Sequence, residues 1–229
     1  MSETSVQSNL LESGGRYELP VPKSGLRYVS DWLSGDAVQR LEAQCDGLLE
    51  IPGGGLRPRA ESWLYGRLVV RPRDTVWMSE NGRPYSYGGA TDESVGWPDW
   101  IQDLARKIAG DPAWRFPDAT GAAPNVALLN VYQGGRDHVD WHADDEPEID
   151  QRSPIASVSL GAVRKFRIRR ARIPPPGAGV RKSEVLSLDS GSLLVMPPGF
   201  QADWEHRVPP ARSAGRRWNL TFRVYGGSP

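Results

Sequence analysis

Two of the three histidines in this sequence stand in a pattern that suits a metal ion. His142 is followed two residues later by Asp144, and side chains along a strand repeat every two residues, so both would point to the same side. His206, 62 residues after Asp144, could supply a third ligand. Two imidazoles and one carboxylate on one face of an octahedron are typical of non-haem Fe(II) oxygenases, which keep three positions open for a cosubstrate and O2. On this pattern alone, surface histidines and solvated acids remain the simpler interpretation.

A second pattern lies near the end of the chain, in the stretch RWNLTFRVY at residues 217–225. It alternates strictly between polar and apolar residues, which predicts a strand with two unlike faces. One face carries two arginines six residues apart, which suit the two ends of a small dicarboxylate because guanidinium groups bind carboxylates bidentately. An edge strand with a wet, charged face is the alternative. The polar face comprises Arg217, Asn219, Thr221 and Arg223, and the apolar face comprises Trp218, Leu220, Phe222 and Val224.

The elements that would position these residues are short strands. From about residue 125 onward, runs rich in Val, Ile, Leu and Phe are separated by turn signals, and no helix of useful length fits between them. This pattern predicts a mainly β fold with flanking helices (α+β), built around a double-stranded β-helix or jelly-roll core. The predicted strands are 126–132, 155–160, 163–168, 185–188, 193–196 and 218–225.

The N-terminal part of the chain predicts helices instead. Apolar residues at helical spacing indicate one helix over residues 36–49 and a second over 97–109, which begins at Pro98. Residues 1–22 are polar and lack any sustained period, so we expect them to form a disordered tail. We interpret residues 23–229 as a single domain, with a helical flank at 23–123 and the jelly-roll core at 124–229.

Composition excludes several other classes of protein. The 229 residues are 38% hydrophobic and include nine Trp, which favours a folded chain, and the single Cys45 excludes an internal disulfide framework and a zinc site of several thiolates. No apolar stretch approaches 18 residues, and the first residues lack the pattern of a signal peptide. We therefore expect no membrane association and a cytoplasmic, non-secreted protein (nuclear if eukaryotic) that is a monomer.

The equal numbers of 28 Lys+Arg and 28 Asp+Glu conceal strongly unlike segments. Residues 137–150 carry seven acids and no Lys or Arg, whereas residues 164–229 carry 13 Lys+Arg and four Asp+Glu. Overall neutrality therefore does not argue against a nucleic-acid partner, because a local basic face can still contact phosphates.

The sequence resembles the AlkB-like dioxygenases, which depend on Fe(II) and 2-oxoglutarate. The resemblance runs from about residue 64 to residue 225 and depends on four segments: NVYQGGRDHVDWHADDE, SPIASVSLGAVRKFRIR, SGSLLVMPPGFQADWEHRVP and RWNLTFR. The match is similar above all to the nucleic-acid repair branch. Within that branch it is similar to the animal double-strand DNA demethylase, whose spacing between the Asn–x–Tyr and His–x–Asp motifs is shared here.

The resemblance implies a site and a reaction. It implies that His142, Asp144 and His206 bind iron and act in catalysis, and that 2-oxoglutarate is bound by Asn130, Tyr132, Arg217, Asn219 and Arg223. The implied reaction consumes O2, converts 2-oxoglutarate into succinate and CO2, and oxidises an N-methyl group that leaves as formaldehyde. Fe(II), 2-oxoglutarate and O2 are therefore the expected cofactors and cosubstrates.

The resemblance also implies that residues 62–89 recognise the substrate base. Tyr85 and Tyr87 match aromatic positions that line the damaged-base pocket, with Tyr87 stacked on one face of the base and His142 on the other. Tyr65 matches the aromatic finger that the relative wedges into the space left by a flipped base, although the relative has a less polar ring there. For any one of these tyrosines, ordinary strand packing is the alternative.

Two charged segments complete the predicted substrate site. Asp145 and Glu146 follow the triad acid, where unpaired carboxylates would favour a cationic methylated base, although a solvated acidic turn is as good an interpretation. The basic run 164–172 predicts a strand with Arg167 and Arg169 outward, positioned for phosphates, with a solvated face as the alternative. Arg71 and Arg73 could assist.

Three functional hypotheses follow from these patterns. The leading one is an oxidative demethylase that repairs N-alkylated bases such as 1-methyladenine and 3-methylcytosine in DNA, with RNA as a further candidate. The second keeps the oxygenase chemistry but assigns RNA, a protein side chain or a small metabolite as the substrate. The third, a binding module without chemistry, is disfavoured because every expected iron and cosubstrate position holds a competent residue.

Overall fold

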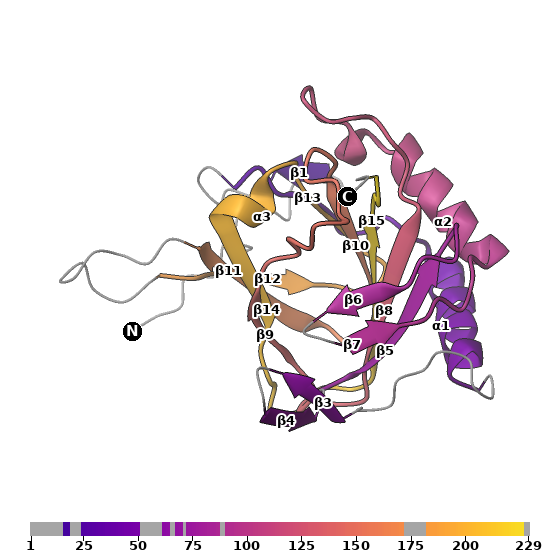
Figure 1. The fold of residues 1–229 in the computed structure, drawn as a ribbon, viewed down its shortest axis with the longest axis vertical. Coiled ribbons are helices and arrows are strands. Elements are labelled where there is room, and N and C mark those ends of the chain that lie inside the picture. Colours follow the sequence, from indigo (N-terminus) through magenta and orange to yellow (C-terminus); the bar gives the residue numbers. More distant parts are fainter. Residues whose placement is uncertain are drawn as a thin grey trace.

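Two antiparallel sheets face each other in the computed structural model and form the body of the protein (Figure 1). The structure describes residues 16–18, 24–50, 61–64, 67–70, 72–87, 90–171 and 182–226. The larger sheet has seven strands in the order β1 (Arg16–Glu18), β2 (Arg27–Val29), β13 (Leu193–Met196), β10 (Ile155–Gly161), β15 (Arg217–Arg223), β8 (Val126–Tyr132) and β5 (Asp74–Ser79). The smaller sheet has the order β12 (Glu184–Leu188), β11 (Arg164–Arg170), β14 (Trp204–Val208) and β9 (Val139–His142).

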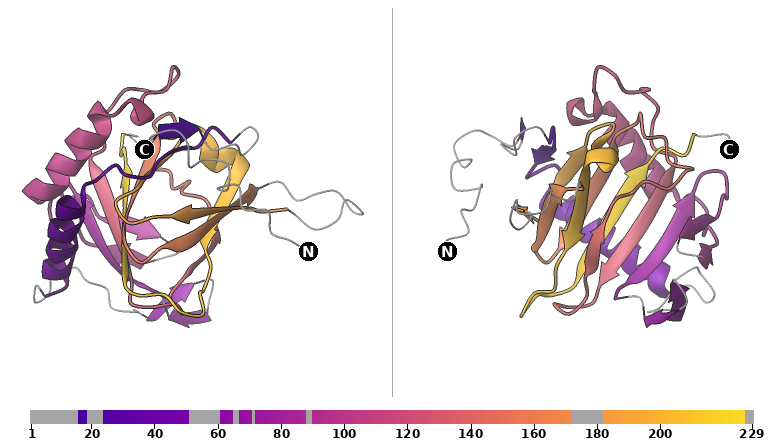
Figure 2. Two further views of the ribbon diagram at one scale, coloured as in Figure 1. Left: turned by 180° about the vertical axis from the view of Figure 1, so that it is seen from behind. Right: turned by 60° about the vertical axis from the view of Figure 1, so that its left-hand side comes forward.

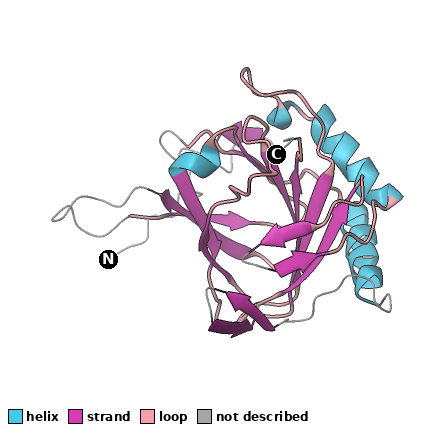
Figure 3. Cartoon of the chain, viewed as in Figure 1, coloured by secondary structure: helices cyan, strands magenta, loops and turns pink. Residues whose placement is uncertain are grey.

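Two hairpins and a few helices complete the described part of the chain. The hairpins pair β3 (Glu61–Leu64) with β4 (Arg67–Val70), and β6 (Tyr85–Tyr87) with β7 (Ala90–Asp92). The helices are α1 (Gly35–Glu50), α2 (Asp99–Gly110), the short 3-10 helix η2 (Pro112–Trp114) and the single turn α3 (Phe200–Asp203). Strands predominate over helices throughout (Figure 3), which confirms the predicted mainly β fold with flanking helices. Among the helices of the described residues, none combines the length and apolar character needed to span a membrane.

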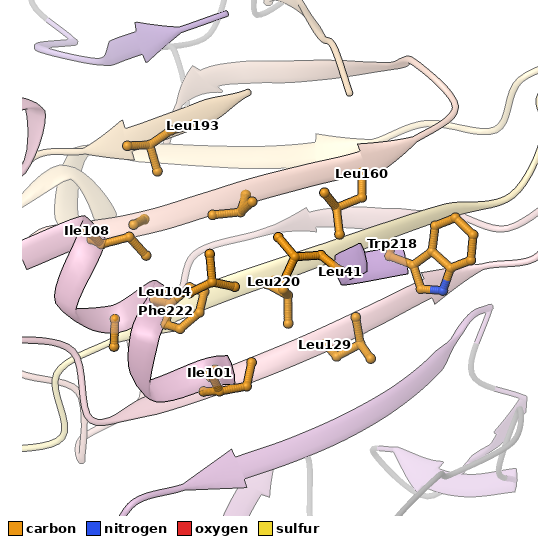
Figure 4. Close-up of a cluster of buried hydrophobic side chains, with 14 of the residues drawn as sticks. Leu41, Ile101, Leu104, Ile108, Leu129, Leu160, Leu193, Trp218, Leu220 and Phe222 are labelled. Carbon is orange, nitrogen blue, oxygen red and sulfur yellow. The ribbon is translucent and has the colours of Figure 1, made fainter. Parts of the chain in front are cut away.

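Helices α1 and α2 cover the outer face of the larger sheet (Figures 1 and 2). In α2, Ile101, Leu104 and Ile108 are buried, and their helical spacing places them on one side, against the sheet (Figure 4). Leu41 of α1 joins the same cluster. The predicted helices at 36–49 and 97–109 therefore differ from the observed ones only at their ends.

Strand β15 has the two unlike faces that its sequence predicts. Trp218, Leu220 and Phe222 belong to the core between the sheet and the helices (Figure 4), whereas the polar residues of the opposite face line the space between the two sheets. The alternative of an edge strand is wrong, because β15 pairs with β10 on one side and β8 on the other. Its arginines are consequently buried rather than solvated.

Several strands are absent from those predicted from apolar runs, although a strand was assumed at His142 for its spacing from Asp144. β9 and β14 lie in the smaller sheet and carry His142 and His206, and β5 forms one edge of the larger sheet. The predicted tail at 1–22 lies mostly outside the described residues, apart from residues 16–18, which pair with β2 as β1. The two predicted strands that shift most are 163–168, observed at Arg164–Arg170, and 218–225, observed at Arg217–Arg223.

Candidate active site

A cavity of about 370 Å³ lies between the two sheets. Its walls come from β5, β8, β10, β13 and β15 on one side and from all four strands of the smaller sheet on the other. Most of the candidate residues named from the sequence line it: Asn130, Tyr132, His142, Asp144, Glu146, Tyr85, His206, Arg217, Asn219 and Arg223. The fold therefore brings together the predicted iron residues and the predicted cosubstrate residues in one space.

The three predicted metal ligands meet at one end of this cavity. His142 ends β9, and His206 is its direct partner across the pairing with β14, so the two imidazole rings lie 4.2 Å apart between centroids. Asp144 follows two residues after His142, and one possible ligand atom from each of the three residues lies within 4.8 Å of the others. His142 Nδ1 donates to the carbonyl oxygen of Asp140 at 2.7 Å, which leaves Nε2 available to a metal.

Electrostatics keep Asp144 and His206 in the protonation states that a metal requires. Burial would raise the pKa of the Asp144 carboxyl, but the Arg223 guanidinium, at 2.8 Å, and both histidines hold that pKa well below its usual range. Burial, and then His142, lowers the pKa of His206 to about 3. An ionised carboxylate and neutral imidazoles are the forms that bind a divalent cation, so the residues present fit an iron ion.

The predicted cosubstrate residues lie on two neighbouring strands. Arg217 is the partner of Tyr132, and Asn219 is the partner of Asn130, across the pairing of β15 with β8. Because paired residues share a face of the sheet, all four side chains line the cavity. Asn219 Nδ2 is held by Ser157 Oγ and by the carbonyl oxygen of Val158, at 2.8 and 3.0 Å.

The hydrogen-bond partners of Arg217 indicate which chemical group the cavity can bind beside it. Arg217 is 1% exposed and donates through Nη2 to Ser159 Oγ at 2.9 Å. Its Nε and Nη1 atoms are also buried, and they have no hydrogen-bond partner among the described residues. Unsatisfied guanidinium donors are costly to bury, and a carboxylate is the group whose geometry satisfies them. The residues therefore fit the distal carboxylate of 2-oxoglutarate.

Two residues that the sequence did not assign to the cosubstrate region contribute to it. Arg73 lines the cavity and donates from Nε to Asn130 Oδ1 at 2.6 Å, so the amide NH2 of Asn130 remains available as a donor. The sequence suggested Arg73 as a phosphate contact together with Arg71, whereas the structure places Arg73 in the cavity. Arg71 lies outside the described residues. Ser159, which holds Arg217, is a buried serine with no pattern of its own in the sequence.

The wall near the metal cluster carries part of the predicted substrate site. Tyr85 is buried, stacks on Trp77 with ring centroids 4.7 Å apart, and donates its hydroxyl to Glu146 Oε1. Glu146 Oε2 is buried and has no partner among the described residues, and burial raises the pKa of this carboxyl. Asp145 is exposed and does not line the cavity, so only Glu146 of the two predicted acids lies in the site. The side chain of Tyr87, and all of Tyr65, lie outside the described residues.

The basic run divides between two surroundings. Arg167 and Arg169 are half-buried and alternate with the buried Phe166 and Ile168, as predicted. Arg169 forms an ion pair with Glu205 at 2.7 Å and does not line the cavity. Arg164, in contrast, is 2% exposed, so this cation does not belong to a solvated stripe.

An aromatic side chain that lines the cavity also contacts two of the basic residues. Trp141 lines the cavity, and the guanidinium groups of Arg169 and Arg207 lie 4.1 and 4.7 Å from its ring centroids. Such cation–π contacts hold both guanidinium groups against the indole. Neither Trp141 nor Arg207 was singled out from the sequence; their positions on strands beside the two histidine ligands were the available signal.

Comparison with known proteins agrees with this geometry. Residues 25–223 match the family model of the 2OG-Fe(II) oxygenase superfamily. Alpha-ketoglutarate-dependent dioxygenase alkB homolog 3 of Rattus norvegicus is 40% identical over 69% of this chain and 52% of the relative. Its Homo sapiens counterpart is 38% identical over 97% of this chain and 75% of the relative. DNA oxidative demethylase ALKBH2 of Arabidopsis thaliana is 35% identical over 70% of this chain and 55% of the relative.

The chain thus spans about half to three quarters of the length of these relatives. The solved structure of OsALKBH1 superposes with a TM-score of 0.56 at 21% identity, covering 88% of this chain and 97% of that chain, and supports the fold. Fe(II), 2-oxoglutarate and O2 are the metal and cosubstrates of the matched family. The chain belongs to the 2OG-Fe(II) oxygenase superfamily and, within it, to the nucleic-acid repair branch of the AlkB-like dioxygenases.

Proposed function

We propose that this protein is an oxidative demethylase of N-alkylated nucleic-acid bases, with 1-methyladenine and 3-methylcytosine in DNA as substrates. The observation that carries the proposal is that one cavity joins a His–Asp–His cluster, an arginine with unsatisfied donors and a buried carboxyl group. When bound, Fe(II) with 2-oxoglutarate supplies the oxidation of an N-methyl group by O2. The products are the demethylated base, formaldehyde, succinate and CO2.

The protein's own residues would orient the two organic reactants. Arg217 would bind the distal carboxylate of 2-oxoglutarate through Nε and Nη1, with Asn130 and Tyr132 beside it on β8. Arg223 neutralises Asp144, so that this ligand remains ionised in a buried site. Orientation of this kind lowers the barrier because the reacting groups are held close before reaction.

The wall formed by Tyr85 and Glu146 would recognise the damaged base. A 1-methyladenine or 3-methylcytosine base carries a positive charge and an exocyclic N–H group. Glu146 Oε2 is a buried acceptor without a partner among the described residues, so it can accept that N–H and be stabilised by the charge. The Tyr85 hydroxyl fixes the carboxyl group by bonding to the other oxygen. A neutral, unmethylated base would gain less from the same contacts.

Phosphate groups next to the target base would contact the outer face of the smaller sheet. Arg167 and Arg207 are direct partners across β11 and β14, and Arg207 lies against Trp141, which lines the cavity. Arg207 forms no ion pair within the described part of the chain, whereas Arg169 is paired with Glu205.

Arg207→Gln should therefore weaken oligonucleotide binding and reduce its salt dependence. For a single strand, the slope of the logarithm of the binding constant against the logarithm of the salt concentration should fall in magnitude by about 0.7. Arg106→Gln, on the exposed side of α2, is the matched control.

The decisive experiment measures demethylation directly. The Fe(II)-loaded protein is incubated with 2-oxoglutarate and with oligonucleotides that carry 1-methyladenine or 3-methylcytosine, as single-stranded DNA, double-stranded DNA and RNA. Release of formaldehyde, together with loss of the methyl group by mass spectrometry, is the expected result. Asp144→Ala provides the inactive control. If neither lesion loses its methyl group in any nucleic acid, the proposal is wrong; loss from RNA alone would assign the enzyme to RNA.

A further inference from the structure

Arg164 is a fully buried cation that the chemistry described above does not use. It begins β11 and is 2% exposed. Its guanidinium donates from Nη2 to the carbonyl oxygens of Asp137 and Pro209, both at 2.7 Å, and from Nη1 to that of Gly134 at 3.4 Å. A buried charge is costly unless hydrogen bonds compensate it, and here backbone carbonyl groups supply that compensation. An apolar side chain at this position would leave these carbonyl oxygens without their donor, so the guanidinium holds this part of the backbone in place.

The carbonyl groups that Arg164 contacts belong to two separate segments. Gly134 and Asp137 lie in the turn that follows β8, and Pro209 follows β14. The two segments touch directly as well, because the backbone N–H of Ala211 donates to the carbonyl oxygen of Gly135 at 2.7 Å. Arg164 therefore joins the ends of two strands, one from each sheet, that border the cavity.

Tyr132 places this buried cation beside the proposed cosubstrate site. The centre of the Arg164 guanidinium lies 5.4 Å from the centroid of the Tyr132 ring, and that of Arg217 lies 5.1 Å from it. The two cations act on each other: burial lowers the pKa of Arg217, and the positive charge of Arg164 lowers it further. A second buried positive charge thus lies against Tyr132, close to the part of the cavity where two Arg217 nitrogens have no partner among the described residues.

We propose that Arg164 is a positioning residue for the distal carboxylate of 2-oxoglutarate. It fixes the turn after β8 and the segment after β14 behind Tyr132, and its charge adds to that of Arg217 in attracting the carboxylate. The inference rests on the proposed cosubstrate, but not on the identity of the methylated base. The inference predicts that Arg164 variants bind ligands with a second carboxylate more weakly. The same variants should not change the binding of the end of the ligand that contacts the metal.

The test compares two ligands that share the metal-binding end. 2-Oxoglutarate and pyruvate are both 2-oxo acids, but pyruvate lacks the distal carboxylate. Their binding to the Mn(II)-loaded protein is measured by calorimetry, so the readout does not depend on turnover or on a nucleic acid. We expect Arg164→Met to weaken 2-oxoglutarate binding about ten-fold, as expected for loss of one charge near a buried carboxylate, and to leave pyruvate binding unchanged.

Two further variants separate positioning from simple stability. Arg164→Lys keeps the charge but cannot reach all three carbonyl groups, so we expect a smaller loss, again confined to 2-oxoglutarate. Arg170→Met, on the same strand but exposed and paired with Asp203, should bind both ligands as the wild type does. If Arg164→Met does not fold, the same comparison of ligands in Arg164→Lys decides the question.

Each outcome bears on the proposal. Equal weakening of both ligands by the Arg164 variants, or no change with either ligand, would overturn it. Selective loss of 2-oxoglutarate affinity would support it even if the wild-type protein failed to demethylate any base, since the demethylase assignment is tested separately. The kinetic counterpart is a raised KM for 2-oxoglutarate with kcat nearly unchanged.

Discussion

The ion pair between Asp144 and Arg223 permits a quantitative prediction about the metal centre. Both residues are 3% exposed, and the Asp144 carboxylate accepts from Arg223 Nη2 at 2.8 Å and from Nε at 3.3 Å. Arg223→Met would leave the carboxylate buried without its counter-ion. Removal of one partner from a buried pair typically costs about 3–5 kcal/mol, because the remaining charge is uncompensated. In a domain of this size that corresponds to a fall of about 6–20 °C in the midpoint of thermal unfolding.

Metal ions should reverse part of this loss, and this distinguishes the pair from an ordinary buried salt bridge. In the variant without Arg223, Mn(II) bound by the His–Asp–His cluster would supply the positive charge that Asp144 lacks. We therefore expect Mn(II) to raise the unfolding midpoint of Arg223→Met by more than that of the wild type. The double variant Asp144→Asn/Arg223→Met removes both charges and should unfold at a higher temperature than Arg223→Met alone.

Calorimetry of the metal-free and Mn(II)-loaded proteins measures all of these values. A midpoint for metal-free Arg223→Met close to that of the wild type would show that the pair is not buried as described. An equal Mn(II) effect in both proteins would show that Asp144 is not a metal ligand. Either result would refute the electrostatic account of the site.

Three further predictions concern the scaffold. Gly135→Ala should destabilise the protein by about 1–3 kcal/mol, since a Cβ there would clash with the Ala211 carbonyl oxygen. Gly134→Ala, whose nearest contact is at 3.9 Å, should be nearly neutral in thermal unfolding. Burial raises the pKa of the Cys45 thiol, so a thiol reagent should modify it only at the rate of unfolding; rapid modification of the native protein would contradict its burial. Burial raises the pKa of Tyr28 to about 12, so stability should fall as the pH rises from about 10, where the unfolded tyrosine ionises, toward 12; Tyr28→Phe should flatten this part of the pH profile.

Periodicity was sufficient to predict the elements with a clear apolar face. The alternation in β15 predicted the apolar face that packs in the core under the helices, and the helical spacing in α2 predicted the side that is buried. β9 lacked such a signal because none of its residues is fully buried: it lines the cavity, and Trp141 and His142 are only partly covered. A strand that lines a binding site exposes part of its inner face, and its alternation is correspondingly weak.

The basic run at 164–172 shows a different limit. A run of charges normally indicates a solvated face, and because of this expectation the burial of Arg164 was not predicted. The position did carry a signal, since Arg164 has the same parity as Phe166 and Ile168, the two residues expected to point inward. Its carbonyl partners lie in two segments distant in sequence, so only the fold could reveal how a cation at an inward position is satisfied.

Two buried arginines line this cavity and a third lies against Tyr132, and their different partners explain how one site can bind groups of opposite charge. Arg223 is paired with Asp144, and Arg164 donates to three backbone carbonyl groups. Each of these two has one buried nitrogen without a partner among the described residues, whereas Arg217 has two. The end of the cavity near Arg217 therefore favours an anion. The wall near Glu146, with its unpartnered carboxyl oxygen, favours a cation. Local charge would thus favour binding of a dicarboxylate cosubstrate and of a positively charged base at different walls of the same cavity. This holds although the net charge of the protein is zero.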